Sequence, residues 1–185
     1  MPISREREKL LNALIFISEN VDKRSKTKYY KLLNFCDFKH FEKTGRSITG
    51  LQYNALERGP VPLKLHEELD HPKPDFIQHL LKRRKDYGGG YEALQLEPRK
   101  QFNADYFSPF ELEILTEICK RHFSDSASEI SEFSHFETGP WHEVWEVQGN
   151  RNGPIPYELV IERRNNQLDQ AVMQLANERS EMFQV

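Results

Sequence analysis

Residues 66–71, HEELDH, carry the side chains most suggestive of chemistry in this sequence, because two histidines stand beside acidic residues. A metalloprotease helix binds zinc through two histidines four residues apart on one face, with a glutamate next to the first. Here His66 and His71 are five residues apart, so on a helix they point about 140° away from each other. Pro72 follows directly. The spacing therefore argues against a local zinc site.

Two further pairings were considered for nucleophilic or metal chemistry. Cys36 and His40 are four residues apart, which places them on one helical face, but no third ligand or orienting group accompanies them. His135 and His142 flank Trp141, yet seven residues and a proline turn separate them. We interpret Cys36 and Cys119, which both lie in apolar helical patterns, as reduced core residues, and we expect no catalytic residue, no metal and no cofactor.

Nucleotide-binding motifs are absent as well. Gly88-Gly89-Gly90 lacks the spaced glycines and the lysine of a phosphate-binding loop, and we interpret it as a hairpin turn. The basic cluster of residues 82–85, KRRK, is expected at the end of a helix, where cations complement the helix dipole. A phosphate contact is the alternative for this cluster. With a net charge of −3 and no reading helix, we expect no nucleic-acid partner.

Composition indicates a folded protein that is not embedded in a membrane. The 185 residues suit one domain or one domain with an appendage, and 12 Phe, 7 Tyr and 2 Trp supply a core. No apolar run approaches the roughly 20 residues of a membrane helix, and the first ten residues lack an apolar signal core, so we expect a cytoplasmic location. Residues 1–50 are rich in Lys and Arg, whereas residues 122–150 contain acids and neither cation. Such asymmetry suits docking on another protein, although two solvated faces would look the same.

These side chains must be positioned by elements that are mostly helical. Residues 26–43 are apolar nearly all round, which predicts a central helix that stops at Gly45. Capping-box spacings at Ser108 and Ser126 predict two further helix starts. The remaining predicted helices span residues 5–21, 60–70, 75–85, 140–147 and 168–183.

A small β element completes the predicted fold. Residues 48–56 form an extended segment, and residues 87–98, YGGGYEALQLEP, form a turn that enters a strand, which could pair with that segment. Gly59-Pro60-Val61-Pro62 then makes a rigid corner, with either proline in the first turn of the next helix. The predicted fold class is mainly α, or α+β: a compact helical domain with a two- or three-stranded β element and an appended C-terminal helix. The predicted division is a domain of residues 1–150 and, after a linker at 150–154, an extension of residues 151–185.

Taken together, several ordered segments resemble the Panacea domain family of SocA-like antitoxins from bacteria and phages. They are the aromatic helix YYKLLNFCDFKHFEKTGR, the segment SITGLQYNALERGPVP, the helix SPFELEILTEICKRHF and the closing pattern SASEISEFSHFETGPWHEVW. The resemblance covers roughly residues 8–148. The segment from Asp70 to Lys100 departs from it, and the tail after Gly153 lies outside it.

The resemblance implies an antitoxin that neutralises a protein toxin encoded beside it by direct contact, without catalysis. It also implies an alternative, in which the protein is an adaptor that delivers the toxin to an ATP-dependent protease. A role in phage defence is expected from the same family. An unrecognised enzyme and a DNA-binding repressor are weaker hypotheses, because no catalytic set and no reading helix can be named.

Several residues are candidates for partner binding, each with a structural alternative. The rigid corner presents Tyr53, Arg58 and Pro60, or it is only a joint between elements. A tryptophan at a helix start is more often a core anchor than an exposed contact. The remaining candidates surround that tryptophan or lie on the apolar stripe of the C-terminal helix: His135, Glu137, Trp141, Val172 and Leu175.

Overall fold

The computed structural model describes residues 5–86, 92–134, 139–161 and 172–178. Its helices are α1 Glu6–Asn20, α2 Lys26–Thr44, α3 Leu63–Asp70, α4 Pro74–His79, α5 Pro109–Arg121, α6 Ala127–Ser134 and α7 Pro140–His142. Shorter turns are η1 Ala104–Tyr106, η2 Glu143–Val147 (a π-helical turn) and η3 Tyr157–Val160. The strands are β1 Asn54–Leu56, β2 Gly59–Val61, β3 Leu80–Asp86 and β4 Glu92–Pro98. The predicted fold class, mainly α with a small β part, is confirmed.

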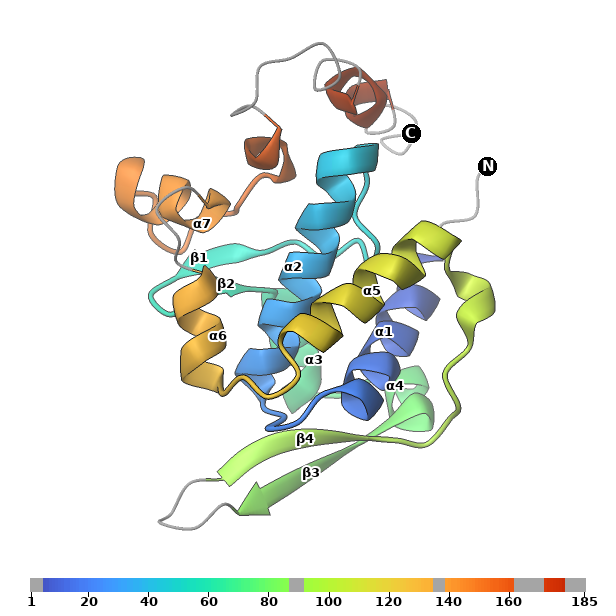
Figure 1. Ribbon diagram of the computed structural model, residues 1–185. Coiled ribbons are helices and arrows are strands. Elements are labelled where there is room, and N and C mark those ends of the chain that lie inside the picture. Colours follow the sequence, from blue (N-terminus) through green and yellow to red (C-terminus); the bar gives the residue numbers. More distant parts are fainter. Residues whose placement is uncertain (1–4, 87–91, 135–138, 162–171, 179–185) are drawn as a thin grey trace.

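Helix α2 lies at the centre of the molecule, as its sequence predicts. Figure 1 shows α1 and α5 packed on it, the β1–β2 hairpin and α6 to one side, and the β3–β4 hairpin beneath. The helix begins with Ser25, whose hydroxyl accepts the backbone N–H of Lys28 at 3.2 Å. It ends at Gly45, whose φ of 67° closes the last turn through a bond to Phe41 O. Both capping boxes are also confirmed, at Ser108 with Glu111 and at Ser126 with Glu129.

Buried cations connect α2 to the segments around it. The ammonium of Lys28 donates to the carbonyls of Asp22, Phe123 and Asp125 at 2.8–2.9 Å, which joins the α1–α2 turn to the end of α5. The ammonium of Lys31 donates to Arg58 O at 2.7 Å, beneath the β1–β2 turn. Burial lowers the pKa of both lysines, in the case of Lys31 to about 7.

The strand pairing differs from the prediction. Residues 92–98 pair with β3, in antiparallel register from Leu80–Pro98 to Asp86–Glu92, and not with the segment of residues 48–56. The predicted helix of residues 75–85 is correspondingly wrong beyond His79, where Leu80 adopts extended angles. Burial of Leu80 and Leu96 in the hairpin outweighs the helix propensity of the cations that follow.

Residues 59–62 form a strand and a helix start. Pro60 was expected to be able to open a helix, but it lies in β2 opposite Ala55. Ala55 turns its N–H and its C=O away from β2, to Gly153 O and Asn152 N, both at 2.8 Å. At the position of Pro60, the pairing with β1 therefore requires no N–H donor from β2. A strand tolerates proline at such a position. Pro62 precedes α3 as its N-cap.

The chain after Gly149 returns to the core. Pro154 bridges to Asn54, and Ile155 N donates to Tyr53 O at 2.8 Å, so residues 152–155 lie along β1. Figure 1 places the helical residues 172–178 over the C-terminal end of α2, where Val172 and Ala176 are buried with Phe41. Within the described part of the chain, no helix has the length and apolar character needed to cross a membrane.

Candidate functional site

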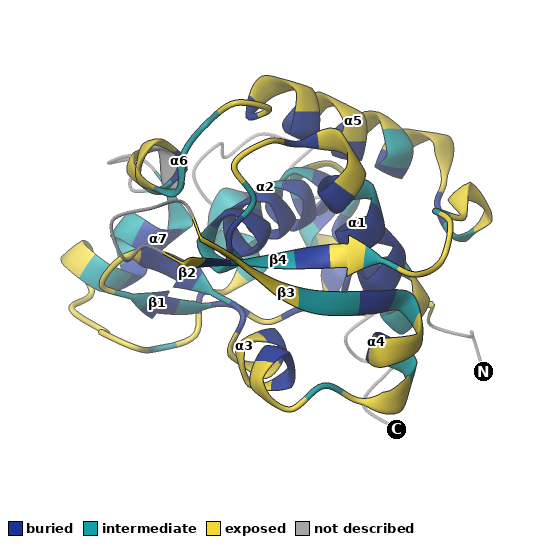
Figure 2. Ribbon diagram, turned by 90° about the horizontal axis from the view of Figure 1, so that it is seen from below, coloured by how far each residue is buried: buried dark blue, intermediate teal, exposed yellow. Residues whose placement is uncertain are grey.

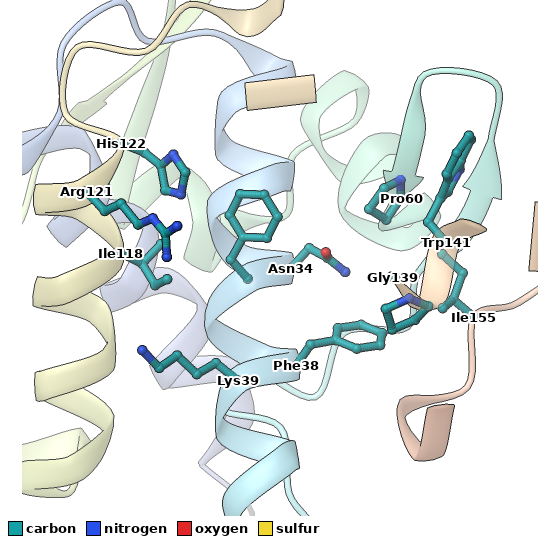
Figure 3. A pocket seen from close by; sticks show the side chains of 12 residues that line it. Asn34, Phe38, Lys39, Pro60, Ile118, Arg121, His122, Gly139, Trp141 and Ile155 are labelled. Carbon is teal, nitrogen blue, oxygen red and sulfur yellow. The ribbon is translucent and has the colours of Figure 1, made fainter. Parts of the chain in front are cut away.

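A groove of about 360 Å³ crosses one face of α2, between the end of α5 and the start of α7. We call it the α2 groove. Its described lining residues are Asn34, Phe35, Phe38, Lys39, Pro60, Ile118, Arg121, His122, Gly139, Pro140, Trp141 and Ile155. In Figure 3, the residues at the end of α5 lie on one side of α2, and Pro60, Trp141 and Ile155 lie on the other.

Trp141 forms the wall of the groove on the side of α7. It follows Pro140, the first residue of α7, and only 6% of its surface is exposed. Its indole N–H donates to Leu56 O at 2.8 Å, which ties α7 to the end of β1. Its ring also stacks on Trp145, with centroids 5.7 Å apart and 14° between planes. Trp141 is thus a core anchor that also lines the groove.

The opposite wall, formed by residues of α2 and of the end of α5, contains the cationic side chains of the groove. The Lys39 ammonium lies 2.5 Å from the Glu117 carboxylate, and Nδ1 of His122 lies 2.7 Å from the Asp125 carboxylate. The His122 ring packs against Phe35, with centroids 5.2 Å apart. Arg121 is exposed, and its side chain reaches toward the groove in Figure 3. The wall therefore combines an aromatic surface with two cations, the half-buried Lys39 and the exposed Arg121.

The buried carboxylate of Asp37 joins α2 to the segment of residues 48–53, next to the residues that line the groove. Asp37 accepts the backbone N–H groups of Ile48 and Thr49 at 2.9 and 2.8 Å. It also accepts the hydroxyls of Thr49 at 2.5 Å and Tyr53 at 2.8 Å. Burial raises the pKa of Asp37 to about 6, although these hydrogen bonds act in the opposite direction. The Tyr53 ring meets the edge of Phe38 at 5.8 Å, so this network supports the floor of the groove.

The structure brings together two of the residues that were predicted to bind a partner and separates the others. Pro60 and Trp141 both line the groove. Tyr53 is 1% exposed and is therefore not available for direct contact with a partner, whereas Arg58 is exposed at the tip of the β1–β2 hairpin.

The two candidates of the C-terminal helix lie at the far end of α2. Val172 is buried there, and Leu175 is 50% exposed. His135 and Glu137 fall outside the described residues.

Sequence reasoning missed the contributions of α2 and α5 to the groove. These are Asn34, Phe35, Phe38 and Lys39 from α2, and Ile118, Arg121 and His122 from α5. The signal was present in the wide apolar surface of α2, since a helix with apolar residues nearly all round leaves some of them for a second surface.

The thiols of this chain are poorly suited to nucleophilic chemistry. Cys36 and Cys119 are buried and unpaired, and burial raises the pKa of both, in the case of Cys119 to about 12. Both are therefore protonated at neutral pH and are weak nucleophiles. The described residues contain no group of three His, Cys, Asp or Glu side chains arranged to hold a metal ion. The groove offers a surface lined by aromatic, apolar and cationic side chains, and neither thiol is among its lining residues.

Comparison with known families identifies the segment that builds the groove. The family model described as "Antitoxin SocA-like, Panacea domain" matches residues 30–142, which is more than half of the chain. No curated protein and no solved structure matches. The matched segment runs from the first turns of α2 to the end of α7 and contains every lining residue of the groove except Ile155.

Proposed function

The chain belongs to the family of SocA-like antitoxins with a Panacea domain, and from this premise we propose that it neutralises a protein toxin by binding it directly through the α2 groove. The observation that carries the proposal is that the family segment itself builds this groove. The toxin is proposed to be a growth-inhibiting protein encoded beside this chain in a bacterial or phage genome, and the two meet in the cytoplasm.

The composition of the groove suits a protein partner. Trp and Arg dominate the residues that contribute most binding energy at protein interfaces, and the groove contains Trp141 and Arg121. Phe35 and Phe38 offer an apolar floor that a partner side chain can cover, which releases water from apolar surface. The exposed Arg121 favours a partner segment with acidic residues and would speed its association.

The proposed mechanism is masking, in which the bound antitoxin covers the surface that the toxin needs. The groove requires no catalysis for this purpose. Trp141 and Pro60 would act as preformed walls, because the bond from Trp141 to Leu56 O fixes both elements before binding.

Residues 151–185 are proposed to add partner-specific contacts. The family match ends at His142, so these residues lie outside the segment that the family shares. Leu175 is 50% exposed on a helical segment that Val172 and Ala176 anchor to Phe41. An exposed leucine on an anchored helix is a suitable contact for a toxin surface.

Co-expression with the protein encoded by the neighbouring reading frame tests the proposal. The wild-type chain should restore growth, and Arg121→Glu should weaken rescue and lower toxin affinity at least tenfold. Lys120→Glu is the matched control: it changes the same charge in the same last turn of α5, but Lys120 does not line the groove. If no neighbouring protein is toxic, the antitoxin proposal fails. If both variants rescue equally, the groove is not the contact.

The half-life of the toxin distinguishes masking from delivery to a protease. Under masking, the toxin persists when the antitoxin is present, and the two purify as a complex. If the toxin instead disappears faster, and this requires an ATP-dependent protease, the adaptor mechanism replaces masking.

A further inference from the structure

The basic cluster Lys82-Arg83-Arg84-Lys85 has a different setting from the one its sequence suggests. In a helix, these cations would complement the dipole at the C-terminal end. The structure places them in β3, a strand that pairs with β4 alone among the described strands. A helix dipole therefore does not account for them. Figure 1 shows the β3–β4 hairpin at one edge of the molecule, and Figure 2 shows that the far half of β3 is exposed.

The strand register determines which backbone groups of β3 face outward. Arg99 N donates to His79 O at 2.8 Å, and in this register the two residues are partners. Hydrogen-bonded pairs alternate along an antiparallel ladder. The residues that bond to β4 are therefore the odd-numbered ones, and the backbone groups of Lys82 and Arg84 point away from it.

Two hydrogen bonds agree with this register. The N–H of Leu80 points away from β4 and donates to Phe76 O, as the last bond of α4. On the other strand, Leu96 N points away from β3 and donates to the hydroxyl of Tyr29 at 3.1 Å. Leu80 and Leu96 are thus even-numbered residues whose backbone N–H groups point away from the partner strand, as the register requires.

The two edges of the hairpin differ in how they are covered. β4 packs on α1 and α2, and Tyr29 of α2 closes its edge at Leu96. No backbone bond within the described ranges joins Lys82 or Arg84 to an element beyond β4. The outer edge of β3 thus offers N–H and C=O groups at two-residue intervals, as a further strand requires.

The side chains on this edge determine what can pair with it. The side chains of Arg83 and Arg84 are 64% and 82% exposed, and among the described residues they form ion pairs with exposed Glu97 and Glu92 across the hairpin. The ammonium of Lys82 contacts the carbonyl of Leu69. A second copy of the same strand would bring like charges together, whereas an acidic strand would meet opposite charges.

We propose that the outer edge of β3 binds an extended, acidic segment of the toxin as a third strand. This inference rests on the proposed function, because it names a second contact with the same partner. Backbone bonds to Lys82 and Arg84 would supply affinity, and Arg83 and Arg84 would select acidic side chains. A nucleic-acid strand is the less favoured occupant. It would bind the cations, but it could not form β-sheet hydrogen bonds with the outward N–H and C=O groups of β3.

A matched pair of substitutions at position 84 separates backbone from side-chain contributions. Arg84→Ala removes the charge and keeps the outward N–H, whereas Arg84→Pro removes both. Neither removes a bond to β4, because the N–H of Arg84 faces outward, and proline is tolerated at such edge positions. Circular dichroism and thermal unfolding of the full-length variants check that the hairpin is retained.

The affinity of the full-length chain for the toxin is the readout. We expect Arg84→Ala to weaken binding several-fold at low salt and Arg84→Pro to weaken it by a further tenfold or more. In the wild-type chain, the amide protons of Lys82 and Arg84 should exchange quickly when free and become protected in the complex. Equal affinities of the two variants, or unprotected amides, would overturn the inference.

Further outcomes distinguish a failure of this inference from a failure of the proposed function. If wild-type rescue and the effect of Arg121→Glu are seen while Arg84→Pro binds like Arg84→Ala, only the inference fails. If the wild-type chain does not neutralise the neighbouring protein, both fail. Binding of a 20-base-pair DNA duplex that is lost in Arg84→Ala, without a change in toxin binding, would assign the edge to nucleic acid and contradict the inference.

Discussion

The hydroxyl of Tyr53 donates a 2.8 Å hydrogen bond to the carboxylate of Asp37, and neither side chain has appreciable contact with solvent. Asp37 comes from the middle of α2, and Tyr53 immediately precedes β1. The bond therefore attaches the β1–β2 corner, which supplies Pro60 to the groove, to the helix that forms its floor.

Tyr53→Phe should destabilise the fold, because it leaves a buried carboxylate without one of its donors. Hydrogen bonds to charged groups contribute about 1.5–3 kcal/mol. Tyr30→Phe is the matched control, since Tyr30 is also buried but its hydroxyl finds no hydrogen-bond partner among the residues that the structure describes. We expect a loss of about 2 kcal/mol in the free energy of unfolding for Tyr53→Phe, and no loss or a gain for Tyr30→Phe. Urea unfolding measures both, and equal effects would contradict the assigned role of the bond.

The pH dependence of stability should carry a contribution from Asp37. Burial raises the folded-state pKa of Asp37 from 3.8 to about 6, so the folded state holds the proton more tightly than the unfolded state does. This group therefore stabilises the fold at low pH, and its contribution falls by about 2 kcal/mol as the pH rises from 4 to 6. In Asp37→Asn this fall should be missing. The measurement is the difference between the two unfolding curves at several pH values, and a constant difference from pH 4 to pH 6 would contradict it.

Lys31 should contribute a pH dependence in a higher range. Burial lowers its folded-state pKa from 10.5 to about 7, so the unfolded state binds the proton more tightly between these values. Stability should therefore increase by about 2 kcal/mol from pH 7 to pH 9 on account of this group. Lys31→Met should abolish the increase, since methionine fills the same space without a charge. Parallel pH profiles of the two proteins from pH 7 to pH 9 would disprove the assignment.

Gly45→Ala should loosen the C-terminal helical segment. Gly45 has a φ of 67°, and a Cβ there would lie 2.8 Å from Val172 O and 3.1 Å from Ala176 N. Gly149→Ala is the matched control, because Gly149 has a φ of 64° and open space where its Cβ would be. A non-glycine residue in this region costs about 1 kcal/mol. We expect this loss for Gly149→Ala and a larger one for Gly45→Ala.

Limited proteolysis shows where the additional loss arises. Cleavage near residues 172–178 should become faster in Gly45→Ala and remain unchanged in Gly149→Ala. Equal destabilisation and equal cleavage of the two variants would show that the close approach of the helix to Gly45 is not energetically important.

Local signals in the sequence predicted much of the helical framework. Ser108 and Ser126 with their glutamates, the glycine stop at Gly45 and the break at Pro72 all lie where expected. These signals work because capping, left-handed turns and the missing N–H of proline act within a few residues of the chain. The wide apolar surface of α2 likewise predicted its central place.

The pairing of strands could not be predicted in the same way. The cations of residues 82–85 have good helix propensity, and only the burial of Leu80 against the core with Leu96 turns the segment into a strand. Local signals allowed Pro60 in the first turn of a helix or at the edge of a strand. The hydrogen bonds of Ala55 to residues 152–153 make the position in β2 acceptable for proline. Such choices depend on partners that are distant in sequence.

By itself, then, the sequence determined the helical class, the capped helix ends at Ser108, Ser126 and Gly45, the interpretation of the cysteines as core residues and the resemblance to an antitoxin family, since each rests on neighbouring residues or on ordered motifs. Only the tertiary structure decided that Pro60 and Trp141 share a groove with Phe35 and Arg121, and that Tyr53 lies behind it. The physical reason is that a groove is formed by side chains from separate elements, and their distances follow from how α2, α5 and the β1–β2 corner pack, which no single stretch of residues specifies.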